Sequence, residues 1–175
     1  FLDTNGIRKR VTAKVVDSNK PSPLMMRKSL EDIEKAWQAT LAEYNNASQK
    51  GMQSLFDSTL GRSTVLAPYG GKCQATPAEA SVQKIQVEKG FTETATILAH
   101  GYNPYIGEWS PFHGAAYAVI EALARIVATG GDWQKARMSF QEYFERLDNI
   151  PERFGKPVAA LLGSIDAQKA FNVPS

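Results

Sequence analysis

The stretch GYNPYIGEWSPFHGA, residues 101–115, leads from a predicted strand into the most apolar helical pattern of the chain. It contains three glycines, two prolines, four aromatic residues and one histidine. This composition predicts a rigid loop that leads into a helix N-terminus, whose unpaired N–H groups can bind an anion. Anion binding requires an exposed helix start, and the sequence does not show such exposure. It therefore favours a second interpretation, in which the segment has a structural role. In that interpretation the loop is packed and Gly114 lets the helix approach a neighbour closely.

A helix is predicted over 111–129, with Pro111 in its first turn and Gly130-Gly131 after its end. The helix is apolar on most sides, so we expect it to be sandwiched between other elements. Strands are predicted over 63–67, 80–87, 92–99 and 135–140, a short helix over 141–147 and a last helix over 157–171. This order predicts an α+β fold, with a mixed or antiparallel sheet and flanking helices.

The region before the sheet is predicted to be helical. Ser29 and Asp32 have the spacing of a capping box at the start of a helix that ends near Asn45. Apolar residues at three- and four-residue spacing predict that this helix has one buried face, made of Leu30, Ile33, Trp37, Leu41 and Tyr44. A shorter helical turn is predicted over 48–56.

Basic and acidic residues are distributed unevenly along the chain. Residues 1–28 hold seven basic and two acidic residues, whereas 29–175 hold 13 basic and 16 acidic ones. We interpret 1–28 as a strand over 10–16 followed by a proline-rich linker, because the basic run lacks the interleaved aromatic residues of a nucleic-acid-binding arm. We expect a sheet-bearing domain over 29–150 and a C-terminal helix over 151–175.

Composition narrows the function classes. The chain has 175 residues, 43% of them hydrophobic, and a formal net charge of +2, which gives no electrostatic reason to expect nucleic-acid binding. Its apolar stretches are too short to predict a membrane span. The single cysteine, Cys73, excludes an internal disulfide, and a chain with one cysteine and two histidines is a poor candidate for a structural zinc site.

Several segments match one enzyme family in order. They are NASQKG at 46–51, FDSTLG at 56–61, PYGGK at 68–72, TPAEA at 76–80, the stretch at 101–115, FQEYFE at 140–145, and GKP at 155–157 leading to ALLG at 160–163. Together they resemble the large, single-chain form of phosphoribosylformylglycinamidine synthase, a glutamine amidotransferase of purine biosynthesis. The resemblance covers nearly everything from Asn45 to Ser175, which makes it more specific than a lone glycine motif.

The resemblance implies a fold, a role and partners. The chain resembles the sheet-bearing domain of the second synthase half, which is similar to the N-terminal domain of the aminoimidazole-ribonucleotide-synthetase superfold. The family enzyme is cytoplasmic and uses ATP, Mg²⁺ and glutamine to convert formylglycinamide ribonucleotide into its amidine. Its reactive histidines and its glutaminase cysteine belong to parts outside this chain. The resemblance therefore implies an interface-forming, non-catalytic domain, whose partners are the first synthase half and the glutaminase domain and which forms a homodimer when isolated.

Site residues follow from the same resemblance. Glu121 matches a carboxylate that binds Mg²⁺ at an auxiliary nucleotide site, and Glu79 is the nearest match to an upstream metal-binding Asp. The family pattern has Asn where this chain has Arg125, whose guanidinium cannot ligate a metal. An ion pair between Glu121 and Arg125, at i, i+4 spacing, is the competing interpretation. Gln141 matches a polar position near the nucleotide and is the candidate cofactor-binding residue.

The other reactive residue types have no catalytic role in this interpretation. By the correspondence between the two synthase halves, Gly101 occupies the position of the first-half catalytic histidine, so His100 is not expected to be catalytic. His113 is expected to pack against or cap a helix, and Cys73 to be an incidental thiol. Two alternatives stay open. One is a free-standing dimerisation or regulatory module that makes no ATP contact, and the other is another ATP-dependent enzyme of the same superfold, acting on selenium or thiamine substrates.

Overall fold

The computed structural model describes residues 10–25, 32–55 and 63–175 of the chain. Contacts within the chain divide it into two compact units. Unit 1 comprises Phe1–Met25, Gly101–Glu121 and Gln134–Ser175, and unit 2 comprises Met26–His100 and Ala122–Trp133. Helix α4, Pro111–Ala128, therefore begins in unit 1 and ends in unit 2. Each unit is built from segments that are distant in the sequence.

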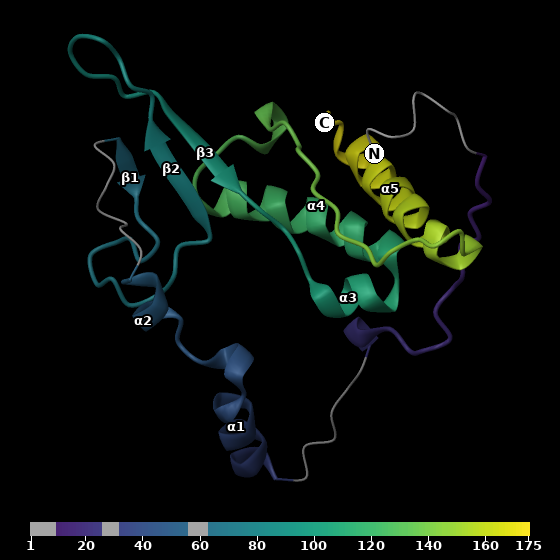
Figure 1. Cartoon of the computed structure of the whole chain (residues 1–175). Coiled ribbons are helices and arrows are strands. Elements are labelled where there is room, and N and C mark those ends of the chain that lie inside the picture. Colours follow the sequence, from purple (N-terminus) through teal and green to yellow (C-terminus); the bar gives the residue numbers. More distant parts are fainter. Residues whose placement is uncertain (1–9, 26–31, 56–62) are drawn as a thin grey trace. The chain divides into compact units, whose positions relative to one another are not determined.

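Unit 2 contains an antiparallel sheet of three strands in the order β1-β2-β3 (Figure 1). The strands are β1 Thr64–Leu66, β2 Ala80–Lys84 and β3 Ala95–Ala99. Strands β2 and β3 pair in unbroken register, whereas the register between β1 and β2 shifts within β1. The α+β class is confirmed, the sheet is antiparallel rather than mixed, and the three strands lie inside the ranges predicted for them.

Unit 2 also contains the helices that precede the sheet, and their predicted burial is wrong. Helix α1, Ile33–Ala42, starts after Asp32, whose side chain accepts a hydrogen bond from the Lys35 N–H at 3.1 Å. Ser29, the predicted cap, and Leu30, the first predicted apolar position, lie outside the described residues. Ile33, Trp37, Leu41 and Tyr44 are each at least 64% exposed. Amphipathic spacing specifies an apolar face, but it does not supply a neighbour to cover that face.

Two short helices complete this region of unit 2. The 3₁₀ turn η3, Tyr44–Asn46, packs against α1, and α2, Lys50–Gln53, lies inside the turn predicted over 48–56. The segment FDSTLG at 56–61, used for the family resemblance, lies outside the described residues. The described part of unit 2 therefore consists of short helices and one small sheet.

Unit 1 is built around the stretch at 101–115, which is not a plain loop. It contains helix α3, Pro104–Trp109, whose cap is Asn103. The Asn103 side chain accepts hydrogen bonds from the N–H groups of Tyr105 and Ile106, both at 3.1 Å. Pro104 in the first turn lacks an N–H that would otherwise need a partner, so asparagine followed by proline is a strong local start signal. The short turn η2, Pro23–Met25, packs against α3.

Glycine at 114 permits the close approach that the sequence predicts. A Cβ atom there would lie 2.5 Å from the Cα of Gly107 and 2.9 Å from its N atom. The first turn of α4 and the α3 helix thus touch backbone to backbone. The packing interpretation of Gly114 is confirmed, because only a residue without a side chain fits at this contact.

Helix α5, Pro151–Phe171, packs through small residues. Its buried positions Gly155, Ala159, Gly163 and Ala167 recur every four residues and so lie on one face. A Cβ atom at Gly163 would collide with the carbonyl of Phe112, and one at Gly155 with the backbone of Lys14. This face therefore places the α5 backbone directly against α4 and against the N-terminal segment.

The N-terminal segment of unit 1 is extended but is not a strand, so the prediction over 10–16 is wrong. The Lys14 N–H donates to the Pro151 carbonyl at 2.8 Å, and Lys14 Nζ lies 3.1 Å from Glu152 Oε1. Further along, the Trp109 indole N–H donates to the Lys20 carbonyl at 2.9 Å. The segment is held by a helix end and a side chain, because no strand of the described chain lies beside it to form a ladder.

The predictions over 135–147 are also wrong. A 3₁₀ turn, η4, covers Trp133–Lys135, and residues 136–147 have no regular secondary structure. The Met138 N–H donates to the carbonyl of Pro174, next to the end of α5, at 2.9 Å. A strand-like apolar pattern forms a strand only where a ladder partner lies alongside, and this segment lies against the end of a helix instead.

The last helix is longer than predicted. It begins at Pro151 rather than at Pro157, which lies inside the helix, and it ends at Phe171 as predicted. Asp148 and Asn149 both have positive φ and form the turn before it, and Asn172 forms a left-handed cap after it. Either proline can occupy a first turn, but only Pro151 follows a left-handed turn, which the sequence pattern did not reveal.

Helix α4 is buried along one stripe rather than on most sides. Val119 is fully buried and Ala122 and Leu123 are buried, whereas Tyr117 and Val127 are exposed. The expected sandwich is therefore seen on one side of the helix only. No helix of the described residues is long and apolar enough to cross a membrane.

We predict that alanine at the two glycines of the Gly107–Gly114 contact has different effects on the free energy of unfolding. Gly114→Ala should lower the free energy of unfolding by about 1–3 kcal/mol, because the added methyl meets backbone atoms that cannot move aside. Gly107→Ala is the matched control, because nothing lies within 4 Å of a Cβ there. It should leave that free energy unchanged or raise it by up to about 1 kcal/mol, since alanine favours helix. Urea unfolding of both variants tests this, and equal losses would contradict the contact.

The pKa of the Glu152 carboxyl provides a second test. It is held below its ordinary value, first by a hydrogen bond from the residue's own backbone and then by Lys14. A lowered folded-state pKa adds stability that is present above the unfolded-state pKa and is lost as the pH falls through the folded-state value. Lys14→Met should raise the pKa of Glu152 partway to its ordinary value in a carbon-detected NMR titration. Lys84→Met, which removes a different ion pair, should leave it unchanged.

Candidate functional site

A polar cluster around Arg125 lies where β2 begins and β3 ends. Arg125 Nε is 2.8 Å from Glu79 Oε2, and Arg125 Nη1 donates to the His100 carbonyl at 2.8 Å. Glu79 precedes β2 and His100 follows β3, and these strands pair Ala80 with Ala99. The antiparallel register therefore brings Glu79 and His100 together. The guanidinium, whose side chain is only 21% exposed, holds both strand ends at the second half of α4.

The same contacts fix the state of the His100 ring. Arg125 Nη1 also lies 3.0 Å from His100 Nε2. A guanidinium has donors only, so Nε2 accepts this hydrogen bond and the ring proton is on Nδ1. Within the cluster the arginine cation faces the Glu79 carboxylate, and the imidazole acts as an acceptor. His100 thus has a structural partner in Arg125.

Glu121, the predicted metal ligand, lies on α4 and faces the start of the 101–115 stretch. Its Oε2 atom accepts a hydrogen bond from the Tyr102 N–H at 2.9 Å. This contact fixes the chain where it leaves β3 for α3. The predicted contact between Glu121 and Arg125 stays a prediction, as does the role of Glu121 as a metal ligand.

The residues present do not fit a divalent-cation site of the kind that the resemblance implies. A hard cation such as Mg²⁺ needs several oxygen ligands, and position 125 supplies a cation instead. That cation is bound to Glu79, the nearest match to a second ligand. Among the described residues no three His, Cys, Asp or Glu side chains are grouped to hold a metal. No chemical step through Mg²⁺ is therefore assigned to this chain.

The start of α4 is capped from within the chain. The Ser110 hydroxyl accepts from the His113 N–H at 3.4 Å and lies 2.8 Å from His113 Nδ1. The His113 ring stacks at a tilt on Trp109, with centroids 4.9 Å apart, and meets Phe112 edge-on at 5.4 Å. His113 therefore both packs and supports the cap. The helix start has partners of its own, which favours the packed interpretation over an anion site.

Gln141 and Cys73 are the two remaining residues that the sequence analysis singled out. Gln141 is exposed in the irregular segment after η4, and its amide donates to the Tyr143 hydroxyl at 2.6 Å. Its role at a nucleotide stays a prediction. Cys73 is exposed and is not in a disulfide.

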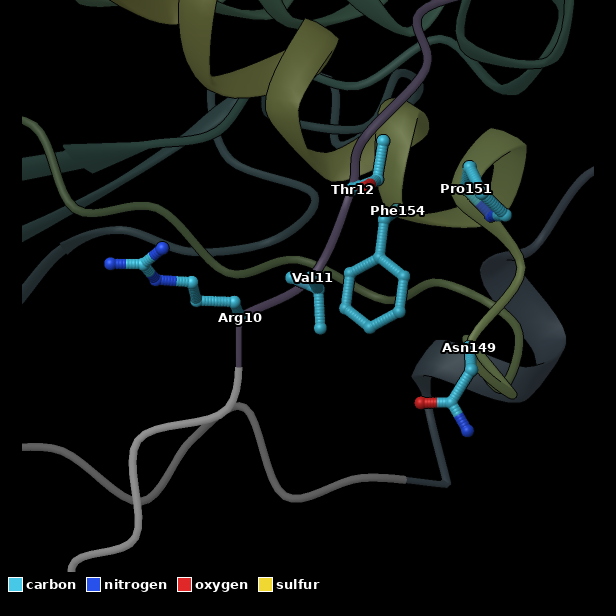
Figure 2. Close-up of a pocket in the computed structure, with 6 residues that line it drawn as sticks. All are labelled: Arg10, Val11, Thr12, Asn149, Pro151 and Phe154. Carbon is cyan, nitrogen blue, oxygen red and sulfur yellow. The ribbon is translucent and has the colours of Figure 1, made fainter.

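Unit 1 has a small pocket between the N-terminal segment and the start of α5 (Figure 2). Its volume is about 210 Å³, and it is lined by Arg10, Val11, Thr12, Asn149, Pro151 and Phe154. The Phe154 ring lies beside Val11, and the Arg10 guanidinium points away from the ring. The volume is below the range of about 300–1,000 Å³ that is usual for small-molecule sites. Sequence reasoning missed this pocket, because it depends on the turn at Asp148 and Asn149.

Unit 2 has a wider groove of about 670 Å³ beside α2. It is lined by uncharged residues only, namely Asn45, Asn46, Ala47, Ser48, Gln49, Met52, Gln53, Tyr69, Ala75 and Pro77. Lys50 Nζ lies 5.5 Å from the centre of the Tyr69 ring and donates to the Gln74 carbonyl at 2.9 Å. Lys50 is thus a cation beside the groove, and its ammonium group is held by the Tyr69 ring and the Gln74 carbonyl. The sequence feature that could have indicated this groove is the run of mainly amide and hydroxyl side chains at 45–49.

The Arg125–Glu79 ion pair predicts a measurable coupling. Arg125→Met and Glu79→Gln should each destabilise the chain, and the double variant should lose less than the sum of the two. The expected coupling is about 0.5–1 kcal/mol, since the carboxylate is more than half exposed. A matched cycle of Arg125→Met with Glu93→Gln should give no coupling, because Glu93 pairs with Lys84. Equal couplings in the two cycles would contradict the pair.

The chemistry of the described residues is that of a clamp. Within unit 2, Arg125 holds Glu79, which precedes β2, together with His100, which follows β3. The candidate site is therefore a structural cluster that sets the geometry of the sheet. Comparison of the chain with protein-family models, curated proteins and solved structures gives no match.

Proposed function

We propose that this chain is the sheet-bearing domain of the second half of a large, single-chain phosphoribosylformylglycinamidine synthase. The parent enzyme is a cytoplasmic ATP-dependent ligase of purine biosynthesis. It takes ammonia from glutamine and converts formylglycinamide ribonucleotide into formylglycinamidine ribonucleotide. The observation that carries the proposal is the ordered set of segments between Asn45 and Ser175.

The positions of these segments in the fold support the proposal. PYGGK forms the loop before β2, TPAEA leads into β2, and the stretch at 101–115 forms α3 and the first turn of α4. In that stretch the two glycines at 107 and 114 make the backbone contact described above. The small antiparallel sheet with helices is also compatible with the aminoimidazole-ribonucleotide-synthetase superfold, to which we assign the domain. These three segments lie at strand ends and helix starts, whereas FQEYFE lies in an irregular stretch and GKP and ALLG lie inside α5.

In this proposal the chain serves as an interface within the parent enzyme. Its sheet carries apolar side chains in contact with water, Val65 and Leu98, and Ile85 directly after β2 is exposed as well. Such side chains favour a covering partner, and the first synthase half is the partner that the resemblance supplies. The isolated chain should use a second copy of itself, burying at least about 1,000 Å² if the contact is specific.

The chemistry of the parent enzyme is assigned to other parts of it. ATP and Mg²⁺ are cofactors of the parent, and no catalytic residue is assigned here. The Arg125 cation beside Glu79 is the local reason for keeping metal chemistry out of this domain. Gln141 remains the candidate nucleotide contact, by the resemblance alone.

One alternative is a free-standing dimerisation or regulatory module without ATP contacts. The exposed apolar residues of the sheet favour it as much as they favour the synthase domain, because both need a covering partner. A further alternative is another ATP-dependent enzyme of the same superfold. The fold class agrees with this alternative, but no specific residue supports it. The ordered segments favour the synthase over both.

The reading frame that encodes the chain tests the proposal. A frame that extends for hundreds of residues on both sides is expected, and its full product should form the amidine from formylglycinamide ribonucleotide with ammonia and MgATP. The 175-residue chain alone should give no turnover under the same conditions. Turnover by the isolated chain would overturn the assignment of catalysis to other parts. A frame that begins near Phe1 would favour the module.

A further inference from the structure

The groove beside α2 in unit 2 is wider than the pocket of unit 1, and it shares no residue with the Arg125 cluster. Its lining comes from 45–53 and from 69–77, and all of these residues belong to unit 2. Its volume of about 670 Å³ lies within the range of about 300–1,000 Å³ that is usual for small-molecule sites. The groove is therefore large enough for a small molecule, and its hydrogen-bonding groups indicate which kind.

Several polar side chains of the lining have hydrogen-bonding capacity to spare. Gln53 and Tyr69 are half-buried, and neither the Gln53 carboxamide nor the Tyr69 hydroxyl has a hydrogen-bond partner among the described residues. Asn46 Nδ2 donates to the Thr40 carbonyl at 2.8 Å and to Glu43 Oε2 at 3.3 Å, so the Oδ1 atom of Asn46 remains an acceptor. The lining thus offers donors and acceptors together.

The two residues that precede α2 add one group of each kind. Ser48 Oγ accepts from the Lys50 N–H at 3.3 Å, which leaves the hydroxyl proton of Ser48 to be donated. Gln49 Nε2 donates to the Ala47 carbonyl at 3.3 Å, which leaves the side-chain oxygen of Gln49 to accept. None of the residues that line the groove carries a charge. Because a charged group loses hydration when it enters a groove whose walls hold no counter-charge, this lining favours an uncharged ligand.

The apolar part of the lining favours one class of uncharged ligand. Met52, Pro77 and the aromatic ring of Tyr69 share the lining with the polar groups. The electron-rich face of an aromatic ring attracts cations, as it does the Lys50 ammonium at 5.5 Å, and more weakly attracts polarised C–H groups. A sugar ring presents C–H groups on its face and hydroxyl groups around its edge. Each hydroxyl both donates and accepts, so one ring matches the apolar part, the donors and the acceptors.

We propose that the groove beside α2 binds an uncharged sugar ring, a hexose or an N-acetylhexosamine. The hydroxyl groups of the sugar bind the Gln53 carboxamide, the Tyr69 hydroxyl and the side-chain oxygens of Asn46 and Gln49. Its C–H face packs on the Tyr69 ring. The inference goes beyond the proposed function and does not rest on it, because it uses only the residues that line the groove.

An NMR titration of the full 175-residue chain with glucose and with N-acetylglucosamine tests the site. Saturable shifts of the backbone signals from 45–53 and 69–77 are expected, with a dissociation constant of about 1–10 mM for a ligand of this size. Adenine stacks on aromatic rings but has no hydroxyl group, and glucose 6-phosphate carries a charge, so both should bind more weakly than glucose. The proposal is overturned if neither sugar gives a saturable shift, or if adenine or glucose 6-phosphate binds more tightly than glucose.

A pair of variants tests the assignment at one residue. Gln53→Leu removes a donor and an acceptor and keeps a similar size, so it should raise the dissociation constant for glucose at least about fivefold, as expected for one or two lost hydrogen bonds. Gln86→Leu is the matched control and should bind like the wild type, because Gln86 is exposed after β2 and lines neither the groove nor the pocket of unit 1. Equal dissociation constants in the two variants would contradict the proposal. If Gln53→Leu does not fold, the wild-type titration still decides, and the reading-frame test is independent of both.

Discussion

Unit 1 depends on direct contact between backbones at positions that carry no side chain. Gly163 meets the Phe112 carbonyl, Gly155 meets the backbone of Lys14, and Gly114 meets Gly107. These contacts bring α5, the start of α4, α3 and the N-terminal segment together. A methyl group at Gly163, Gly155 or Gly114 would push these backbones apart.

Unit 2 is organised differently, because its apolar residues are largely in contact with water. The buried apolar side chains of its described part are Ala122 and Leu123, both on α4. Its sheet is held by the β2–β3 ladder and by Arg125, which binds the strand ends through Glu79 and His100. A unit with so little buried apolar area gains stability from a covering partner, which is the physical basis for assigning it an interface role.

The Arg125 cluster is where the chain departs from the pattern of the proposed parent enzyme. Where the family pattern expects metal ligands, this chain has a fixed cation that is hydrogen-bonded to its neighbours. A guanidinium neutralises Glu79 permanently, so the carboxylate is used for the geometry of the strand ends and not for coordination.

The sequence by itself determined the elements whose signals are local. These are the positions of β1, β2 and β3, the asparagine–proline start of α3, the proline start of α4 and the need for glycine at 114. Only the tertiary structure decided that the α1 face is exposed, that 10–16 and 135–140 are not strands, and that Arg125 binds Glu79. The reason is physical: caps and periodicity act within a few residues, whereas a ladder, a buried face and an ion pair each need a partner from elsewhere in the chain.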